Sequence, residues 1–264
     1  MHIIKWELKS NLKSLTIWCM IFIVLIFMMT SEFSAYYNNP EMADIMSMLP
    51  ETMLKAFSMD NANLTTTTGY LSLVGLYFYL MAGVFAVLLG SGIISKEERD
   101  KTAEYLMTMP ISREKILLAK LMAALINCLV LLLTIVGATI LALFKYDLDQ
   151  AFYTFLLDLS AAIMLEMLIF LSVGMFLASV LKRYKSSGKI SASLLMLLYF
   201  INVAIGLSKN LDALEYVTPF KYFNAQKILQ TGQLEFKFVI LSIGIIFGGI
   251  VCTFLFYPRR DLHI

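Results

Sequence analysis

The chain contains 264 residues with a formal net charge of +2, of which 59% are hydrophobic and only 15% are charged, and its mean hydropathy is +0.78. A water-soluble domain usually carries about a quarter charged residues, so this composition indicates a protein that lies in a lipid bilayer. The two histidines, His2 and His263, stand near the ends of the sequence, which argues against a Ser-His-Asp triad or a histidine metal site and leaves no candidate catalytic or metal-binding residue.

The segment 1–14 precedes the first apolar run, and its residues 2–14 are predicted to form an amphipathic helix in the membrane interface. The apolar side of this helix carries Ile4, Leu8 and Leu12, and the neighbouring stripe carries Lys5, Lys9 and Lys13. These lysines are expected to face anionic lipid headgroups, and Trp6 suits the same depth. A basic tail that only orients the first span is the alternative interpretation. A cleaved signal peptide fits less well, because five more apolar runs follow.

Six apolar stretches approach or exceed the length of about 20 residues that a helix needs to cross the bilayer core. They cover residues 15–29, 70–94, 116–144, 151–181, 190–207 and 238–257. The predicted fold is therefore an all-α integral membrane protein with six transmembrane helices. Residues 1–264 are expected to form a single domain with both termini on the same side of the membrane.

The basic residues are distributed unevenly between the two sides of these spans. Fifteen of the 21 Lys and Arg residues fall on the side of the termini. Because basic loops stay in the cytoplasm, we expect both termini and the segment 95–115 to be cytoplasmic, in a membrane that we expect to be the bacterial plasma membrane. The six basic residues on the outer side are Lys55, Lys145, Lys209, Lys221, Lys227 and Lys237.

Two segments, 30–69 and 208–237, are expected on the outer side. Residues 39–60 in the first carry five methionines. Short amphipathic helices on the membrane surface are the simpler interpretation of this stretch. The alternative is a surface for hydrophobic substrates, because Met-rich surfaces adapt to varied apolar partners. The segment 208–237 is predicted to be a structured outer loop.

The segment 95–115 places ten charged residues between the second and third spans. Ser95 and Glu98 have the spacing of a capping box, which predicts a new helix at the end of the second span. Glu97 and Lys101 are spaced to pair along that helix.

Pro110 is predicted to end this short helix. Ser112 is then placed to cap the third span, with Glu114 in its first turn. Tyr105, Leu106 and Met109 give the short helix an apolar patch at its far end. A connection between neighbouring helices needs only a few residues, so this longer one is predicted to dock against another protein.

The fourth span contains two acidic residues, Asp158 and Glu166. A helix over residues 151–181 is about 46 Å long, which places Asp158 near the outer headgroups. Glu166 falls near the middle of the membrane, where an ionisable side chain costs several kcal/mol unless it is paired or faces water. It is therefore either a pathway residue or a neutral, hydrogen-bonded structural acid. Asn127 and Asn202 are candidate partners for it.

Gly244 and Gly248 form a G-x-x-x-G pattern in the last span. This pattern allows two helices to approach closely. Packing within the chain is the predicted role, and a dimer face is the alternative.

The stretch "EERDKTAEYLMTMPISREKILLAK" resembles the intracellular signature of ABC-2-type transporter permeases. The matching positions are Glu97, Glu98, Thr102, Glu104, Leu106, Pro110, Ser112, Arg113 and Lys120. The position before the threonine, often Gly in that family, is Lys101 here. The amphipathic start, the six spans, "VTPFKYFNAQKIL" and the final "YPRRDL" are also similar to this family, so the resemblance covers nearly the whole chain.

The resemblance implies a permease that receives force from a separate ATPase through a coupling helix within residues 95–115. The implied coupling residues are Glu97, Glu98, Lys101, Thr102, Glu104, Leu106, Pro110 and Arg113. No G-x-x-x-x-G-K-[ST] loop occurs in the sequence, so ATP and Mg²⁺ are expected on the partner chain. The family also implies two ATPase copies and a second permease chain, identical or related.

The sequence leaves the substrate open, because exporters of peptides, antibiotics, lipids and glycans share this architecture. A channel or a proton-coupled carrier that uses Glu166 is the second hypothesis. Against it, only one acid lies deep in the membrane and no internal repeat is evident. An intramembrane enzyme is the third hypothesis, and it lacks a catalytic pair within the spans.

Overall fold

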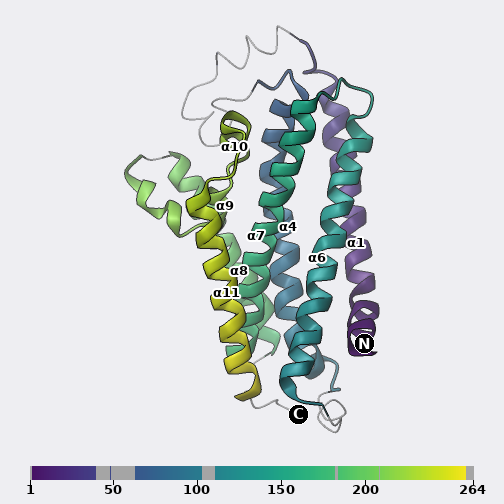
Figure 1. The fold of residues 1–264 in the computed structure, drawn as a ribbon, viewed down its shortest axis with the longest axis vertical. Coiled ribbons are helices and arrows are strands. Elements are labelled where there is room, and N and C mark those ends of the chain that lie inside the picture. The colour runs from purple at the N-terminus through teal and green to yellow at the C-terminus, as the bar shows by residue number, and fades with distance from the viewer. Residues whose placement is uncertain are drawn as a thin grey trace.

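The computed structural model describes residues 2–39, 48, 63–102, 111–181, 184–207 and 209–259. All regular secondary structure in these ranges is helical, which confirms the predicted fold class. Six of the helices are long and apolar enough to cross a membrane, and they run side by side as one elongated bundle (Figure 1).

Each long helix matches one of the six predicted apolar stretches, with the C-terminal ends agreeing to within one residue in α6, α7 and α11. These helices are α1 (His2–Phe33), α4 (Thr67–Arg99), α6 (Arg113–Leu143), α7 (Gln150–Val180), α8 (Tyr184–Leu207) and α11 (Phe236–Phe256). Three of them, α4, α6 and α7, begin slightly earlier than hydropathy alone suggests, because polar side chains cap them. The Asp149 carboxylate accepts from the Phe152 amide at 2.8 Å at the start of α7, and the Thr66 hydroxyl accepts from the Gly69 amide at 3.1 Å at the start of α4.

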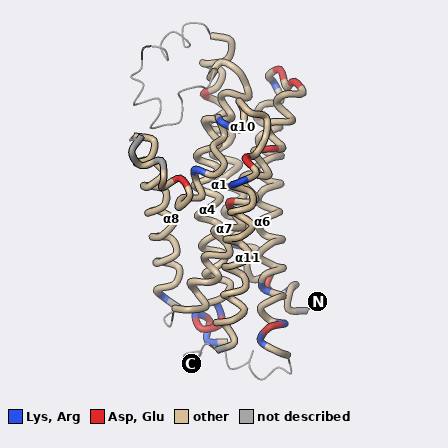
Figure 2. Tube along the Cα trace, turned by 60° about the vertical axis from the view of Figure 1, so that its left-hand side comes forward, with Lys and Arg blue, Asp and Glu red and all other residues tan. Residues whose placement is uncertain are grey.

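One end of the bundle is rich in charged side chains. α1 begins there, α4 ends there and α6 begins there (Figure 1). Lys and Arg gather around this end beside a smaller number of acidic residues (Figure 2). We call it the basic end, and the other end the opposite end.

α4 and α7 form the centre of the bundle, with α6, α8 and α11 packed around them and α1 along α6. Their backbones touch, because a Cβ on Gly90 would meet the Leu171 carbonyl oxygen at 2.4 Å and one on Gly174 would meet the Val87 carbonyl oxygen at 2.5 Å. Glycine at both positions is what allows this approach. The two central helices therefore form a closely packed pair.

α1 is a single continuous helix, so residues 2–14 do not form a separate helix before the first span. The range 2–33 contains neither Gly nor Pro to interrupt it. Lys5, Lys9 and Lys13 are exposed as predicted, but Glu7 is buried against the bundle. The contacts of Glu7 hold this part of α1 in line with the span.

The segment between α8 and α11 folds back onto the bundle. It consists of η1 (Lys209–Tyr216), α9 (Pro219–Tyr222) and α10 (Ala225–Thr231). The Phe220 ring lies 5.2 Å from the Phe170 ring of α7 and 5.6 Å from the Tyr199 ring of α8. The predicted outer loop 208–237 is thus largely a structured cover, with α10 packed against α4 and α7.

The G-x-x-x-G pattern of α11 does not mediate packing among the described residues, contrary to the prediction. An added Cβ on Gly244 or Gly248 would have no neighbouring atom within 4 Å in the described part of the chain. The close contact is made by Gly249 instead, where a Cβ would meet the Ser172 Oγ at 2.9 Å. The packed face of α11 is rotated away from the pattern.

Candidate functional site

Four buried charges meet at the basic end. Lys120 Nζ donates to Glu7 Oε1 at 3.1 Å, to Glu97 Oε1 and to the carbonyl oxygen of Ile93 at 2.6 Å. Lys96 Nζ donates to Glu7 Oε2 at 2.9 Å. All four side chains are at most 3% exposed. This buried charge cluster, Glu7, Lys96, Glu97 and Lys120, joins α1, α4 and α6.

The predicted capping box at Ser95 is wrong, because α4 continues to Arg99. Ser95 is buried within the helix, and its Oγ lies 2.9 Å from the Ser187 Oγ on α8. Glu97 pairs with Lys120 rather than with Lys101. Packing against α1, α6 and α8 supplies partners for these polar groups. The helix can therefore continue through the polar residues that follow the apolar run.

α4 ends in a Schellman motif that involves Lys101. The Asp100 amide donates to the Lys96 carbonyl oxygen at 2.8 Å, and the Thr102 amide donates to the Glu97 carbonyl oxygen at 2.9 Å. Lys101 adopts a left-handed conformation with φ of 54°, which favours glycine. These bonds end α4 at Arg99, with Asp100 as the residue that caps the helix.

The start of α6 agrees with the prediction. The Ser112 hydroxyl accepts from the Lys115 amide at 3.4 Å, and Glu114 lies in the first turn. Arg113 Nη1 donates to the carbonyl oxygen of Pro258 at 2.8 Å. Pro258 belongs to η2 (Tyr257–Arg259), which follows α11, so Arg113 ties the return of the 95–115 segment to the last span.

The predicted coupling residues separate into three groups. Glu97 and Glu98 are buried in the bundle. Lys101 is exposed, and Thr102 and Arg113 are partly exposed. Glu104, Leu106 and Pro110 lie outside the described residues, as does nearly all of the Met-rich stretch 39–60.

Glu166 is buried in the middle of α7, at 1% exposure. Neither of its carboxylate oxygens has a hydrogen-bond partner in the described part of the chain. The predicted pairing with Asn127 is therefore wrong, since the Asn127 amide donates to the Ala123 carbonyl oxygen within α6 at 2.7 Å. Asn202 does not bond to Glu166 either. Tyr79 on α4 lies close enough to Glu166 for an electrostatic interaction.

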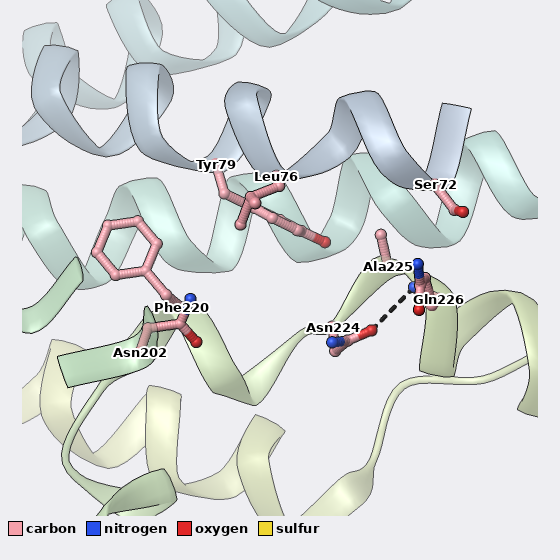
Figure 3. Close-up of a pocket in the computed structure, with 8 residues that line it drawn as sticks. All are labelled: Ser72, Leu76, Tyr79, Asn202, Phe220, Asn224, Ala225 and Gln226. Atoms are coloured by element: carbon pink, nitrogen blue, oxygen red, sulfur yellow. Dashed lines mark hydrogen bonds between the residues drawn. The ribbon is translucent and has the colours of Figure 1, made fainter. Parts of the chain in front are cut away.

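Tyr79 also borders a small polar pocket between α4, α8 and the folded-back segment (Figure 3). The lining residues are Ser72, Leu76, Tyr79, Asn202, Phe220, Asn224, Ala225 and Gln226. The pocket has about 20 Å³ of space for water centres, which is enough for one water molecule. Tyr79 thus lines a hydratable pocket and also lies within electrostatic range of Glu166.

A family model described as ABC-2 family transporter protein matches residues 1–262 of the chain. The chain belongs to the ABC-2 transporter family. It is therefore a multi-pass membrane protein and a permease component of an ABC transporter, a family whose members associate with an ABC ATPase. No curated protein matches the sequence.

The family assignment gives Lys101 a structural meaning. In the resemblance noted above this position is often glycine, and the left-handed φ at the end of α4 is a conformation that favours glycine. Lysine preserves the turn at some conformational cost. In this ABC-2 permease, α4 thus ends within the 95–115 segment without a glycine.

Sequence reasoning missed Glu7 in this ABC-2 permease. It is the only acidic residue before Glu32, and it interrupts a stretch that otherwise resembles a basic interfacial helix. A lone acid among lysines, close to a membrane span, was the available signal. Its partners could not be read locally, because Lys96 and Lys120 lie about 90 and 110 positions further along the chain.

Proposed function

We propose that this chain is the membrane-spanning subunit of an ATP-driven exporter. It moves a hydrophobic or amphipathic substrate outward, such as an antimicrobial peptide, a drug or a lipid-like molecule. Two copies of a separate ATPase hold ATP and Mg²⁺, and a second permease chain, identical or related, completes the pathway. The basic end faces the cytoplasm of a bacterial plasma membrane.

The buried charge cluster is the observation that carries this proposal. α4 leads into the segment 95–115, α6 leads out of it, and Lys120 and Lys96 tie both ends to Glu7 on α1. Removing one partner of a buried ion pair costs about 3–5 kcal/mol. A force applied to the 95–115 segment therefore moves α1, α4 and α6 together, which is what alternating access by rigid-body motion requires.

The folded-back segment packs against the bundle toward the opposite end, where substrate leaves in an exporter. Phe220 and Tyr222 pack the folded-back segment against the bundle. Opening at this end requires these aromatic contacts to separate. An apolar or amphipathic substrate suits such an exit better than a small ion does.

The test begins with co-purification of the chain and the ATPase encoded beside it. Glu104→Ala combined with Leu106→Ala should weaken ATPase association at least tenfold, because losing a partly buried interfacial charge contact costs about 2–5 kcal/mol and about 1.4 kcal/mol suffices for tenfold. Membrane insertion should be unchanged, since neither residue lies in a span. Lys209→Ala, in η1 at the other side of the bundle, is the control and should alter neither property.

If the double variant binds the ATPase normally and still transports, the coupling role belongs elsewhere, with the 182–189 connection as the next candidate. If substrate moves into sealed vesicles without ATP, the ATP-driven proposal fails altogether.

A proton-coupled carrier is the second candidate function, because Glu166 is buried without a hydrogen-bond partner among the described residues. It also interacts electrostatically with Tyr79, which lines a hydratable pocket. Proteoliposomes that contain only the permease separate the two candidates. Transport driven by a pH gradient without the ATPase favours the carrier. Transport that requires both the ATPase and ATP favours the exporter.

A further inference from the structure

The small pocket beside Tyr79 lies where the start of α10 packs against α4 (Figure 3). The two helices approach closely there, because a Cβ on Gly75 would meet the Ala225 Cβ at 3.2 Å. Ser72, Gly75 and Tyr79 are spaced by three and four residues, so they lie on one face of α4. The pocket is therefore part of the contact between the bundle and the folded-back segment.

Two buried polar groups line this pocket without a hydrogen-bond partner among the described residues. They are the Tyr79 hydroxyl and Nε2 of Gln226, and the two residues are 3% and 4% exposed. In Figure 3 the Tyr79 ring extends from α4 with its hydroxyl toward the start of α10, where Gln226 lies. Burial of an unpaired polar group is unfavourable, so we expect both groups to bond to a molecule within the pocket.

The other polar side chains of the lining do not supply that partner. The Ser72 hydroxyl donates within α4, at 2.7 Å. Asn224 Oδ1 accepts from the backbone amides of Gln226 and Lys227 at 3.0 Å and 3.1 Å, which caps α10. Asn202 on α8 reaches the same pocket and bonds to neither of the two unpaired groups. Polar side chains from α4, α8 and the start of α10 therefore converge on this pocket.

The size and charge of the pocket restrict what it can hold. Its space of about 20 Å³ for water centres fits one water molecule. The residues that line it carry no formal charge, so the site suits a neutral polar molecule rather than an ion. Phe220, which lines the pocket, is held in place by its ring contacts with Phe170 and Tyr199. A water molecule meets these limits, since it is small and both donates and accepts hydrogen bonds.

We propose that the pocket binds one ordered water molecule that bridges the Tyr79 hydroxyl of α4 to the Gln226 side-chain amide of α10. The water gives each buried group a partner and links the folded-back segment to the centre of the bundle. When α10 moves away from α4, bulk water replaces these hydrogen bonds, so the link is readily reversible. Its use as a latch at the substrate exit rests on the exporter proposal, whereas the water site itself does not.

The experiment is hydrogen–deuterium exchange of the purified permease–ATPase complex in mild detergent, without ATP or substrate. α10 has only seven residues, and a helix of that length depends on its packing, so its amides exchange when it leaves α4. Tyr79→Phe and Gln226→Leu remove the polar groups and nearly keep the side-chain shapes. Each should speed exchange in residues 228–232 about fivefold, which corresponds to about 1 kcal/mol.

The double variant tests whether one water serves both groups. Removing either partner breaks the same bridge, so Tyr79→Phe combined with Gln226→Leu should exchange about as fast as either single variant. Independent effects, such as one that Tyr79 exerts through Glu166, would instead multiply to about 25-fold. Tyr77→Phe and Gln230→Leu make the same changes at exposed positions of α4 and α10. These two controls should leave the exchange unchanged.

A high-resolution cryo-EM map of the wild-type complex checks the site directly. The expected result is density for one water within hydrogen-bond distance of both the Tyr79 hydroxyl and the Gln226 amide. A map in which the two side chains bond directly, or in which another residue fills the pocket, would overturn the proposal. Multiplied effects in the double variant, or controls that exchange as fast as the test variants, would do the same. Neither measurement involves transport, so failure here leaves the exporter proposal intact, and absence of ATP-driven transport would leave the water site intact.

Discussion

At the scale of single residues, Glu7 of α1 connects its helix to both α4 and α6. One carboxylate accepts from two lysines of different helices, at 2.9 Å and 3.1 Å. Without it, Lys96 would lose its acidic partner among the described residues, and Lys120 would keep Glu97 and the Ile93 carbonyl oxygen. The Trp6 ring, with Lys96 Nζ 3.7 Å from its centroid, adds a cation–π contact to the same side chain.

Glu7→Gln should therefore lower the free energy of unfolding by about 3 kcal/mol, since it leaves a buried positive charge without its counter-charge. The measurement is denaturation of the purified permease in mild detergent. Glu114→Gln, which removes an exposed acid near the start of α6, should change stability by less than about 0.5 kcal/mol. Equal stability of the two variants would contradict the role assigned to the charge cluster.

Glu166 differs from Glu7, because its carboxylate oxygens lack hydrogen-bond partners among the described residues. Glu166→Gln keeps the shape of the side chain and removes the charge, so assembly with the ATPase should be preserved. If the residue lines the pathway, the variant should change substrate-stimulated ATP hydrolysis or its pH dependence. Unchanged transport over a wide pH range would assign Glu166 a structural role only.

At the scale of elements, the contact between α4 and α7 depends on glycines at particular positions. Gly90→Ala would place a Cβ 2.4 Å from the Leu171 carbonyl oxygen, and overpacking of this kind costs about 1–3 kcal/mol. We expect a clear loss of thermal stability. Gly92→Ala is the matched control on the same helix, where a Cβ meets nothing within 4 Å. It should be neutral or stabilise by up to about 1 kcal/mol, because alanine favours the helix.

Features that are local to one helix could be predicted from the sequence, whereas contacts between helices could not. The six spans were predictable, because apolar length is a local property of each segment. The capping box at Ser95 and the G-x-x-x-G at Gly244 were local patterns too, but tertiary packing decided both. The Ser95 hydroxyl bonds to the Ser187 hydroxyl on α8, and α11 packs against Ser172 through Gly249. The charge cluster needed the relative rotation of three helices, which no local pattern encodes.

At the scale of the whole molecule, the charged groups at the two ends are organised differently. At the basic end, Glu7, Lys96, Glu97 and Lys120 are buried and join helices. At the opposite end, the described ion pairs are at the surface, such as those of Glu235 with Lys227 and Lys237. Surface pairs of this kind contribute little to stability. The bundle is therefore held more firmly at the end where force is proposed to enter than at the end where substrate is proposed to leave.

The proposed orientation of the whole molecule gives the last prediction. Basic residues concentrate at one end, so the positive-inside rule places that end in the cytoplasm. In a variant without the three native cysteines, Glu114→Cys at the exposed start of α6 should be shielded from a membrane-impermeant thiol reagent in intact cells. Gln233→Cys, in the exposed turn before α11, should react. Opening the cells should make both react, which shows that shielding comes from the membrane rather than from burial. Reaction of Glu114→Cys but not of Gln233→Cys in intact cells would reverse the orientation, and an ATPase in the cytoplasm could then no longer reach the 95–115 segment.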